Sequence, residues 1–270
     1  MQLEQLITGF EELWPLEGAE PWDSPGLVAG TPAQDIRSVL LTVDVTSDVV
    51  NEAIHGGFNL VLAHHPFLLR GVQSVSEAQS KGSTLSRAIR SSLAIYSAHT
   101  NADIVIDGVS DTLAKLLGLE QVRPLVPSAP GIGHGRVGNL PEVMSLGEFA
   151  QTVARVLPAT ATGVRVSGDY SLPIETVALC GGAGDSFLAN AVAQRADVYV
   201  TSDLRHHVVQ DAREQALLTR GTPALVDVSH WAAEFVWLAV AKQLLERKFP
   251  EVKFEVCDLR TDPWDFVVTQ

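Results

Sequence analysis

The sequence predicts an α/β protein with two domains and mostly parallel sheets, and three observations support this prediction. Short apolar runs typical of buried strands alternate with segments whose apolar residues have helical spacing. Side chains of metal-ligand type follow several of these runs, at the carboxyl ends of strands where α/β sheets form their binding crevice. A stretch rich in Pro and Gly, residues 124–138, interrupts the alternation, which then starts again.

The composition is that of a globular protein with room for one large or two medium domains. The chain has 270 residues, of which 46% are hydrophobic. Cys180 and Cys257 lie far apart without a CxxC spacing, so neither a disulfide framework nor a thiolate zinc site is expected. The first residues contain no signal-peptide core and no apolar run spans a bilayer, so we expect a cytoplasmic protein without a membrane partner.

The formal net charge is −13, from 32 acidic and 19 basic residues. Such a surplus of carboxylates argues against docking on a bare phosphate backbone, so a nucleic-acid partner is not expected. Acidic surfaces usually keep proteins soluble, and the charge alone therefore does not indicate a metal site.

In the first region, an amphipathic helix is predicted over residues 2–14, and strands and helices alternate after it. Strands are expected over residues 38–44, 59–63 and 93–98, and helices over 47–55, 83–90 and 107–117. Residues 21–30 have turn composition. Trp22 and Asp23 in this turn are candidates for lining a site, although a loop anchored by a half-buried Trp is the favoured interpretation.

The Pro- and Gly-rich stretch lacks the Gly-Lys-Ser/Thr of a phosphate loop, so it favours a hairpin or linker at a domain boundary. After it, helices are expected over residues 146–157, 187–195 and 230–245 and in a segment with His206 and His207, and strands over 163–166, 176–180, 197–201, 224–228 and 253–257. The last strand is expected to return to the first sheet. The first domain is therefore predicted to span residues 1–125 completed by 230–270, and the second 126–229.

His64 and His65 directly follow the buried run Leu60–Ala63. Neighbouring side chains of an extended chain point to opposite sides, and Pro66 disfavours helical geometry before it, so the two rings are expected to serve two adjacent sites. An isolated His-His pair is more often a satisfied polar pair than a metal site. Other ligand-type residues along the chain shift the balance towards a metal site.

Asp103 follows a predicted strand, and His230 and Glu234 are four residues apart at the start of a helix, hence on one face. Together with His64 and His65 they offer only nitrogen and oxygen donors, which suits zinc, iron, manganese, nickel or cobalt. Five ligands do not saturate two ions. The remaining coordination positions could hold water, so catalysis is possible. Glu234 is then expected to bridge the metals, and a metal-bound water is the expected nucleophile.

Other polar residues have weaker assignments. Asp44 and His99 sit at predicted strand ends, and we expect them to orient the ligands. His206 and His207 are either substrate-side residues or solvated helix residues, and the Gly181–Gly184 turn either holds an anion or is only a tight turn. The chain has no Gly-x-Ser-x-Gly, His-Glu-x-x-His, Walker or dinucleotide motif, so serine or cysteine nucleophiles are not predicted.

Three motifs occur in a specific order, namely His-His-Pro at 64–66, His-Thr-Asn-x-Asp at 99–103 and His-x-x-x-Glu at 230–234. Weaker matching pieces are Trp22–Leu27, Leu41–Thr46, Gly108–Asp111, Gly135–Gly138, Gly181–Gly184 and Thr201–Asp203 with His207. In these pieces, which run nearly end to end, the chain resembles the Nif-three-like proteins, also labelled GTP cyclohydrolase I type 2 homologues or dinuclear metal centre proteins.

The resemblance implies a Nif-three-like fold of two related three-layer α/β domains, two divalent metals per chain, and a homohexamer (a trimer of dimers) with its metal centres facing an inner cavity. By position, His64 and Asp103 would hold one metal, His65 and His230 the other, and Glu234 would touch both. The chain is too short for the inserted domain of longer relatives.

The sequence departs from the family pattern beside the ligands. Ser202 and Ser229 stand where glycine is expected, and Ala102 where leucine is expected. These changes bear on loop geometry more than on metal binding.

Two functions follow from this reading. The first is a metal-dependent hydrolase of a small nucleotide-like or phosphorylated substrate, of cyclohydrolase or phosphoesterase type. The second is a non-enzymatic metal-binding or regulatory scaffold, because no motif that would read a substrate is recognisable. Turnover by metal-loaded protein would distinguish the two.

Overall fold

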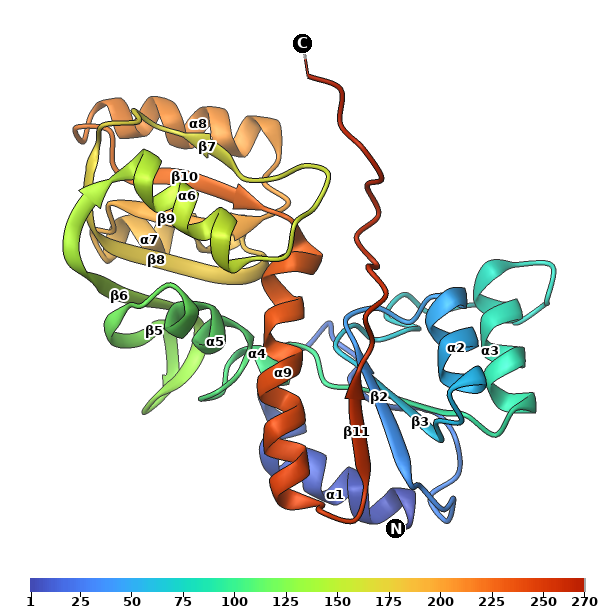
Figure 1. Cartoon of the computed structure of the whole chain (residues 1–270). Coiled ribbons are helices and arrows are strands. Elements are labelled where there is room, and N and C mark those ends of the chain that lie inside the picture. Colours follow the sequence, from blue (N-terminus) through green and yellow to red (C-terminus); the bar gives the residue numbers. More distant parts are fainter. Residues whose placement is uncertain (270) are drawn as a thin grey trace. The chain divides into compact units, whose positions relative to one another are not determined.

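The computed structural model describes residues 1–269 and shows two compact units, each with its own sheet (Figure 1). Unit 1 contains Met1–Ala102 and Leu238–Thr261, and unit 2 contains Asp103–Trp237 and the chain end from Asp262. The predicted boundary at residue 125 lies inside strand β5 (Glu120–Ala129), which belongs to the second sheet. The contacts place the change of unit after Ala102 instead, because the segments that follow pack on that second sheet.

The sheet of unit 1 is mostly parallel, as predicted. Its strands are β1 (Gly26–Ala29), β2 (Ser38–Thr42), β3 (Leu60–Ala63), β4 (Ala94–Ser97) and β11 (Lys253–Val256), in the order β1-β4-β3-β2-β11. The pairing of β11 with β2 confirms that the last strand returns to this sheet. Strand β1, an antiparallel edge strand, was not predicted from the sequence. The flanking Pro25 and Gly30 give this segment the composition of a turn.

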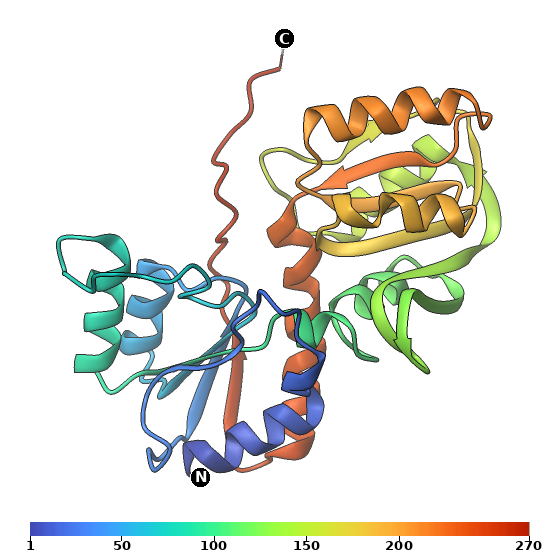
Figure 2. The same ribbon diagram turned by 180° about the vertical axis from the view of Figure 1, so that it is seen from behind.

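Helices cover both faces of this sheet. They are α1 (Leu3–Leu13), α2 (Ser47–His55), α3 (Ser80–Arg90) and the part of α9 (His230–Lys248) that follows Trp237. Figures 1 and 2 show α2 and α3 on one face, and α1 and this part of α9 on the other. Helix α2 begins where predicted because the Thr46 hydroxyl accepts a hydrogen bond from the Val49 amide, at 3.2 Å.

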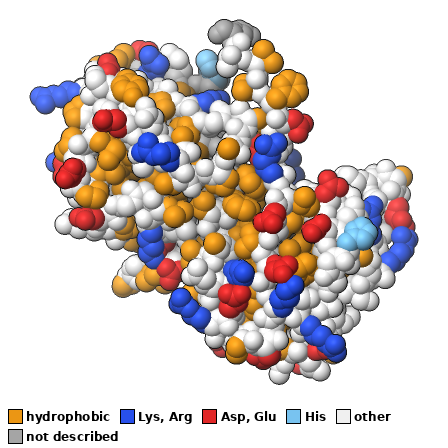
Figure 3. Space-filling model, in the orientation of Figure 1, with side chains coloured by type: hydrophobic (Ala, Val, Ile, Leu, Met, Phe, Trp, Pro, Cys, Tyr) orange, Lys and Arg blue, Asp and Glu red, His pale blue; other side chains and the backbone are white. Residues whose placement is uncertain are grey.

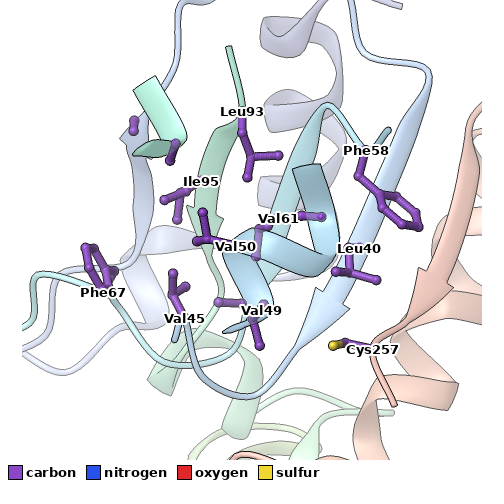
Figure 4. Packing of buried hydrophobic residues seen from close by; sticks show 14 of the residues in the cluster. Leu40, Val45, Val49, Val50, Phe58, Val61, Phe67, Leu93, Ile95 and Cys257 are labelled. Atoms are coloured by element: carbon purple, nitrogen blue, oxygen red, sulfur yellow. The ribbon is translucent and has the colours of Figure 1, made fainter. Parts of the chain in front are cut away.

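The core between α2 and the sheet is apolar (Figure 4). Val49 and Val50 of α2 are fully buried against a layer that includes Val61 and Ile95. Burial of each of these side chains contributes about 1.5–3 kcal/mol to stability. The Cys257 thiol, just after β11, completes one edge of the cluster and is 2% exposed.

The sheet of unit 2 is mixed, so the prediction of mostly parallel strands describes only the first sheet. Its strands are β5, β6 (Ile132–Ser145), β7 (Arg165–Ser167), β8 (Pro173–Ala183), β9 (Val198–Ser202) and β10 (Ala224–Val228), in the order β5-β6-β8-β9-β10-β7. Only the β8–β9 and β9–β10 pairs are parallel. The Pro130-Gly131 turn reverses the chain between β5 and β6, so the Pro- and Gly-rich stretch is a hairpin and not a linker.

The helices of unit 2 also lie on both faces of its sheet. They are α5 (Val109–Leu116), α6 (Leu146–Val156), α7 (Leu188–Ala193), α8 (His206–Leu217) and the start of α9, and the short α4 (Thr100–Asp103) lies at the change of unit. Figures 1 and 2 show α6 on one face and α7 and α8 on the other. The three-layer α/β arrangement therefore holds in both units. None of the helices in residues 1–269 is long and apolar enough to cross a membrane.

A buried ion pair fastens the β5–β6 hairpin to the start of unit 2. The Arg136 side chain is 1% exposed and donates to the Asp111 carboxylate at 2.9 Å. Its remaining acceptors are the carbonyl oxygens of Gly133, Gly135, Ile104 and Val105, at 2.7, 2.8, 3.2 and 2.7 Å. Because Ile104 and Val105 directly follow Asp103, this arginine fixes the backbone next to a predicted metal ligand.

Candidate metal centre

His64 and His65 stand where the buried strand β3 ends. Their backbone amides donate hydrogen bonds to the carbonyls of Thr42 and Val43, at 2.9 Å each. The backbone hydrogen bonds between β3 and β2 therefore continue for two residues beyond β3. The two rings are 5.1 Å apart between centroids and tilted by 42°. The expectation that they point to opposite sides was wrong, because the chain bends after Ala63 and strand alternation stops there.

His99 completes a group of three imidazoles in unit 1. Its ring centroid lies 5.2 Å from that of His64 and 5.4 Å from that of His65. One ring nitrogen of each residue lies within 4.8 Å of the others. We expected His99 only to orient ligands, but this geometry makes it a candidate ligand in its own right. The sequence feature that could have indicated this role is the position of His99 after β4, which is similar to the position of His64 after β3.

Each ring of this group has its Nδ1 atom against an oxygen acceptor. The contacts are His64 with the Ala98 carbonyl at 2.9 Å, His65 with Asp44 at 2.7 Å, and His99 with Asp23 at 2.8 Å. A neutral imidazole that donates from Nδ1 carries its lone pair on Nε2, which is then the ligand atom. Asp44 therefore makes the orienting contact expected of it.

The loop before β1 is anchored by Asp23 and not by Trp22, which corrects the sequence interpretation. The Asp23 side chain is completely buried, whereas Trp22 is 61% exposed. The carboxylate accepts hydrogen bonds from the Thr100 hydroxyl and amide, at 2.5 and 3.1 Å. Burial alone would raise the pKa of Asp23, but hydrogen bonds from His99 and Thr100 outweigh it and lower that pKa to about 2.

In unit 2, His230 and Glu234 share one face of α9, as their spacing predicts. The His230 Nε2 and Glu234 Oε1 atoms are 2.9 Å apart, and the His230 Nδ1 contacts Asp203 at 2.6 Å. The helix begins after β10 because the Ser229 hydroxyl accepts from the Ala232 amide, at 3.2 Å. That hydroxyl also donates to Asp262 at 2.6 Å, a contact that glycine at this position would lack.

The charge state of His230 follows from its two carboxylate neighbours. Burial would lower the pKa of His230, but the Glu234 charge and the hydrogen bonds to Asp203 and Glu234 raise that pKa well above its ordinary value. A ring held between two carboxylates is an imidazolium in the absence of metal. A cation between Nε2 and Oε1 would take the place of that proton, so this pair fits a divalent ion.

Asp103 and Glu234 both lie close to Cys180, near the end of β8. Burial raises the pKa of the Cys180 thiol, and the charges of these two carboxylates raise it further. The thiol therefore stays protonated in the absence of metal. Two predicted metal ligands of unit 2, Asp103 and Glu234, thus act on the same thiol.

Gly182 lies against this pair and has a left-handed φ of +69°. The predicted Gly181–Gly184 turn is in fact mostly the end of β8, which runs to Ala183. A Cβ atom at position 182 would lie 2.6 Å from Glu234 Oε1 and 3.2 Å from His230 Nε2. Glycine is therefore required here for close approach of the backbone to two predicted ligands.

A Gly182→Ala variant is expected to lose metal affinity by about 10- to 100-fold, because the added methyl group displaces Glu234. Gly163→Ala is the matched control, since Gly163 has a φ of +60° but nothing within 4 Å of its Cβ position. Both variants carry about 1 kcal/mol of backbone strain. Titration with cobalt measures the metal affinity, and unfolding in urea measures the cost of the backbone strain. Equal metal affinities of the two variants would contradict the role of Gly182.

The structure does not gather all of the candidate residues. His206 and His207 are exposed on α8, with ring centroids 5.2 Å from each other. Within residues 1–269, neither belongs to a group with the spacing of metal ligands. Asp203 was not named as a site residue, although it follows β9 directly. Its left-handed φ of 57° was not visible in the sequence.

Comparison with known proteins supplies relatives along nearly the whole chain. The family model Duf34/NIF3 (NGG1p interacting factor 3) matches residues 1–263. A Streptomyces coelicolor protein called GTP cyclohydrolase 1 type 2 homolog is 40% identical, over 97% of this chain and 93% of its own. A Mycobacterium tuberculosis protein of the same name is 31% identical over 374 residues, covering 98% of this chain and 97% of that protein. That longer alignment means that the mycobacterial protein carries inserted residues that this chain lacks.

A solved structure is similar as well. The crystal structure of a Bacillus cereus protein related to NIF3 matches with a TM-score of 0.90 and 25% identity, over 99% of both chains. This likeness confirms the predicted α/β fold. The match to the family model over residues 1–263, together with the Streptomyces relative, shows that this chain belongs to the Duf34/NIF3 family.

Proposed function

We propose that this chain binds two divalent metal ions through His64, His65, Asp103, His230 and Glu234. The observation that carries the proposal is shared by the imidazoles of both units. His64, His65 and His230 all have Nδ1 against an oxygen acceptor, the orientation in which a metal-binding imidazole offers Nε2 as its ligand atom.

The donor atoms narrow the choice of ion. They are imidazole nitrogens and carboxylate oxygens, which suit zinc, iron, manganese, nickel or cobalt. The two cysteines are buried and free. Reduced, unpaired thiols also support the cytoplasm as the location of this protein.

We propose further that the centre hydrolyses a small nucleotide-like or phosphorylated substrate. The name GTP cyclohydrolase 1 type 2 homolog of the relatives supports this class. A divalent cation supplies Lewis acidity, which polarises a phosphoryl or carbonyl oxygen. The chain's own contribution is to hold the donors in place, with Asp44 orienting His65 and Asp203 orienting His230. Glu234 would contact both ions.

Elemental analysis of protein purified without chelator tests the metal proposal. Two ions per chain are expected, and a chain that stays free of metal after incubation with each candidate ion would refute it. A panel of phosphate monoesters and purine nucleotides then tests hydrolysis. Full metal occupancy without turnover of any compound would favour the non-enzymatic scaffold.

We also propose that the chain forms a homohexamer, as a trimer of dimers. The exposed apolar chain end supports assembly: Trp264, Phe266, Val267 and Val268 are 62, 80, 60 and 76% exposed. Figure 3 shows apolar side chains uncovered along this segment. A run of large apolar side chains in water favours burial against a partner.

Val268→Ser is expected to shift the hexamer towards smaller species in sedimentation velocity, because it removes apolar area from the terminal segment. Val143→Ser is the matched control, since Val143 is also a valine and is 59% exposed on β6. If wild-type protein sediments as a monomer, the assembly proposal fails. Identical behaviour of the two variants would show that the chain end is not the contact.

A further inference from the structure

Trp22 is a large aromatic side chain held at a fixed place in unit 1. Although its side chain is 61% exposed, its loop is tied down on both sides. The Asp23 carboxylate next to it is bonded to His99 and Thr100, and the Glu20 amide donates to the Thr100 hydroxyl at 2.9 Å. The indole is therefore exposed without being on a loose loop.

This indole lies beside the imidazole group. The ring centroids of Trp22 and His99 are 5.9 Å apart, and the planes are nearly perpendicular, at 79°. The ring centroid of His99 in turn lies 5.2 Å from that of His64 and 5.4 Å from that of His65. A flat ligand stacked on the indole would therefore reach the group of candidate metal ligands.

The chemistry of such a surface favours a planar heteroaromatic ring. An exposed indole offers a π face on which any nucleobase stacks, without demanding a particular hydrogen-bond pattern. The exposed residues that flank it are Pro21, a small apolar ring, and Ser24, which is polar. A protein partner would require a wider apolar core around the anchor. A single fixed aromatic ring suits a small flat ligand better.

We propose that Trp22 is the stacking platform for the purine ring of a nucleotide whose remaining part faces the imidazole group. The inference rests on the proposed function, because it names the substrate class of that site. It assigns to Trp22 a binding role for the base, and it leaves metal binding to the histidines and carboxylates.

Calorimetric titration of metal-loaded protein with GMP tests this proposal without requiring turnover. Trp22→Ala is expected to raise the Kd for GMP by about 5- to 100-fold, the range found when a base-stacking aromatic is removed. Trp22→Phe keeps a stacking face and should stay within about threefold of wild type. Tyr170→Ala is the matched control, because Tyr170 is also an aromatic side chain and is 63% exposed, and this variant should bind GMP like wild type.

Glycerol phosphate, which has no ring, separates stacking from other effects. Its affinity and the metal content should be the same in wild type and in Trp22→Ala. The proposal is overturned if GMP binds both proteins equally, if wild type does not bind GMP, or if both ligands weaken together. Because binding is measured directly, a protein that binds GMP through Trp22 yet shows no hydrolysis would refute only the proposed activity.

Discussion

Replacement of Glu234 by glutamine is expected to leave fewer than two metal ions per chain and to lower any hydrolytic rate by at least about 10³-fold. Glu234 is 3% exposed, and its Oε1 atom lies 2.9 Å from His230 Nε2. Glutamine keeps the shape of this side chain but not its charge, so the fold survives while the contact proposed for both ions is lost. Elemental analysis and turnover of the best substrate measure the two effects.

The control for this variant is on the same helix. Glu246→Gln also removes one carboxylate from α9, but the Glu246 side chain is 48% exposed and pairs with Lys242, at 3.7 Å. It should retain both ions and full activity. Two ions per chain in Glu234→Gln, with unchanged turnover, would exclude this glutamate from the centre.

Substitution of Arg136 by methionine is expected to lower the free energy of unfolding by about 3–5 kcal/mol. The loss is large because the Asp111 carboxylate and four backbone carbonyls lose a buried donor. Lys115 compensates only in part, since it contacts Asp111 from an exposed position, at 2.8 Å. Urea unfolding followed by circular dichroism gives the free-energy difference.

Two further variants show whether the effect comes from the uncompensated carboxylate. The exposed Arg155→Met should change stability by less than about 0.5 kcal/mol. In the Arg136→Met background, Asp111→Asn should recover part of the loss, because no buried charge is left unpaired. A loss for Arg136→Met no larger than that for Arg155→Met would show that the pair contributes little.

The fold was predictable wherever local periodicity was strong. The expected bounds of residues 47–55 and 224–228 coincide with α2 and β10. Strand β1 escaped because glycine and proline flank a run of only four residues, and its pairing with β4 depends on residues far along the chain. The mixed order of the second sheet likewise depends on which strands meet, which periodicity does not encode.

The site was predictable to the extent that spacing along the chain fixes geometry. The contact between His230 and Glu234 follows from four residues of helix, and His64 and His65 are neighbours in sequence. The contact between Asp23 and His99 joins residues 76 positions apart, so the sequence alone did not reveal that aspartate as an anchor. The binding of two ions by these residues remains a prediction, which the metal content per chain tests.

The two thiols provide one internal reporter for each unit. Cys257 lies in unit 1 and Cys180 in unit 2, both are buried, and burial raises the pKa of each thiol. Alkylating reagents attack the exposed thiolate, so native protein should resist them and react only after local opening. Mass spectrometry of partially alkylated chains can therefore measure the rate at which each unit opens, without any engineered probe.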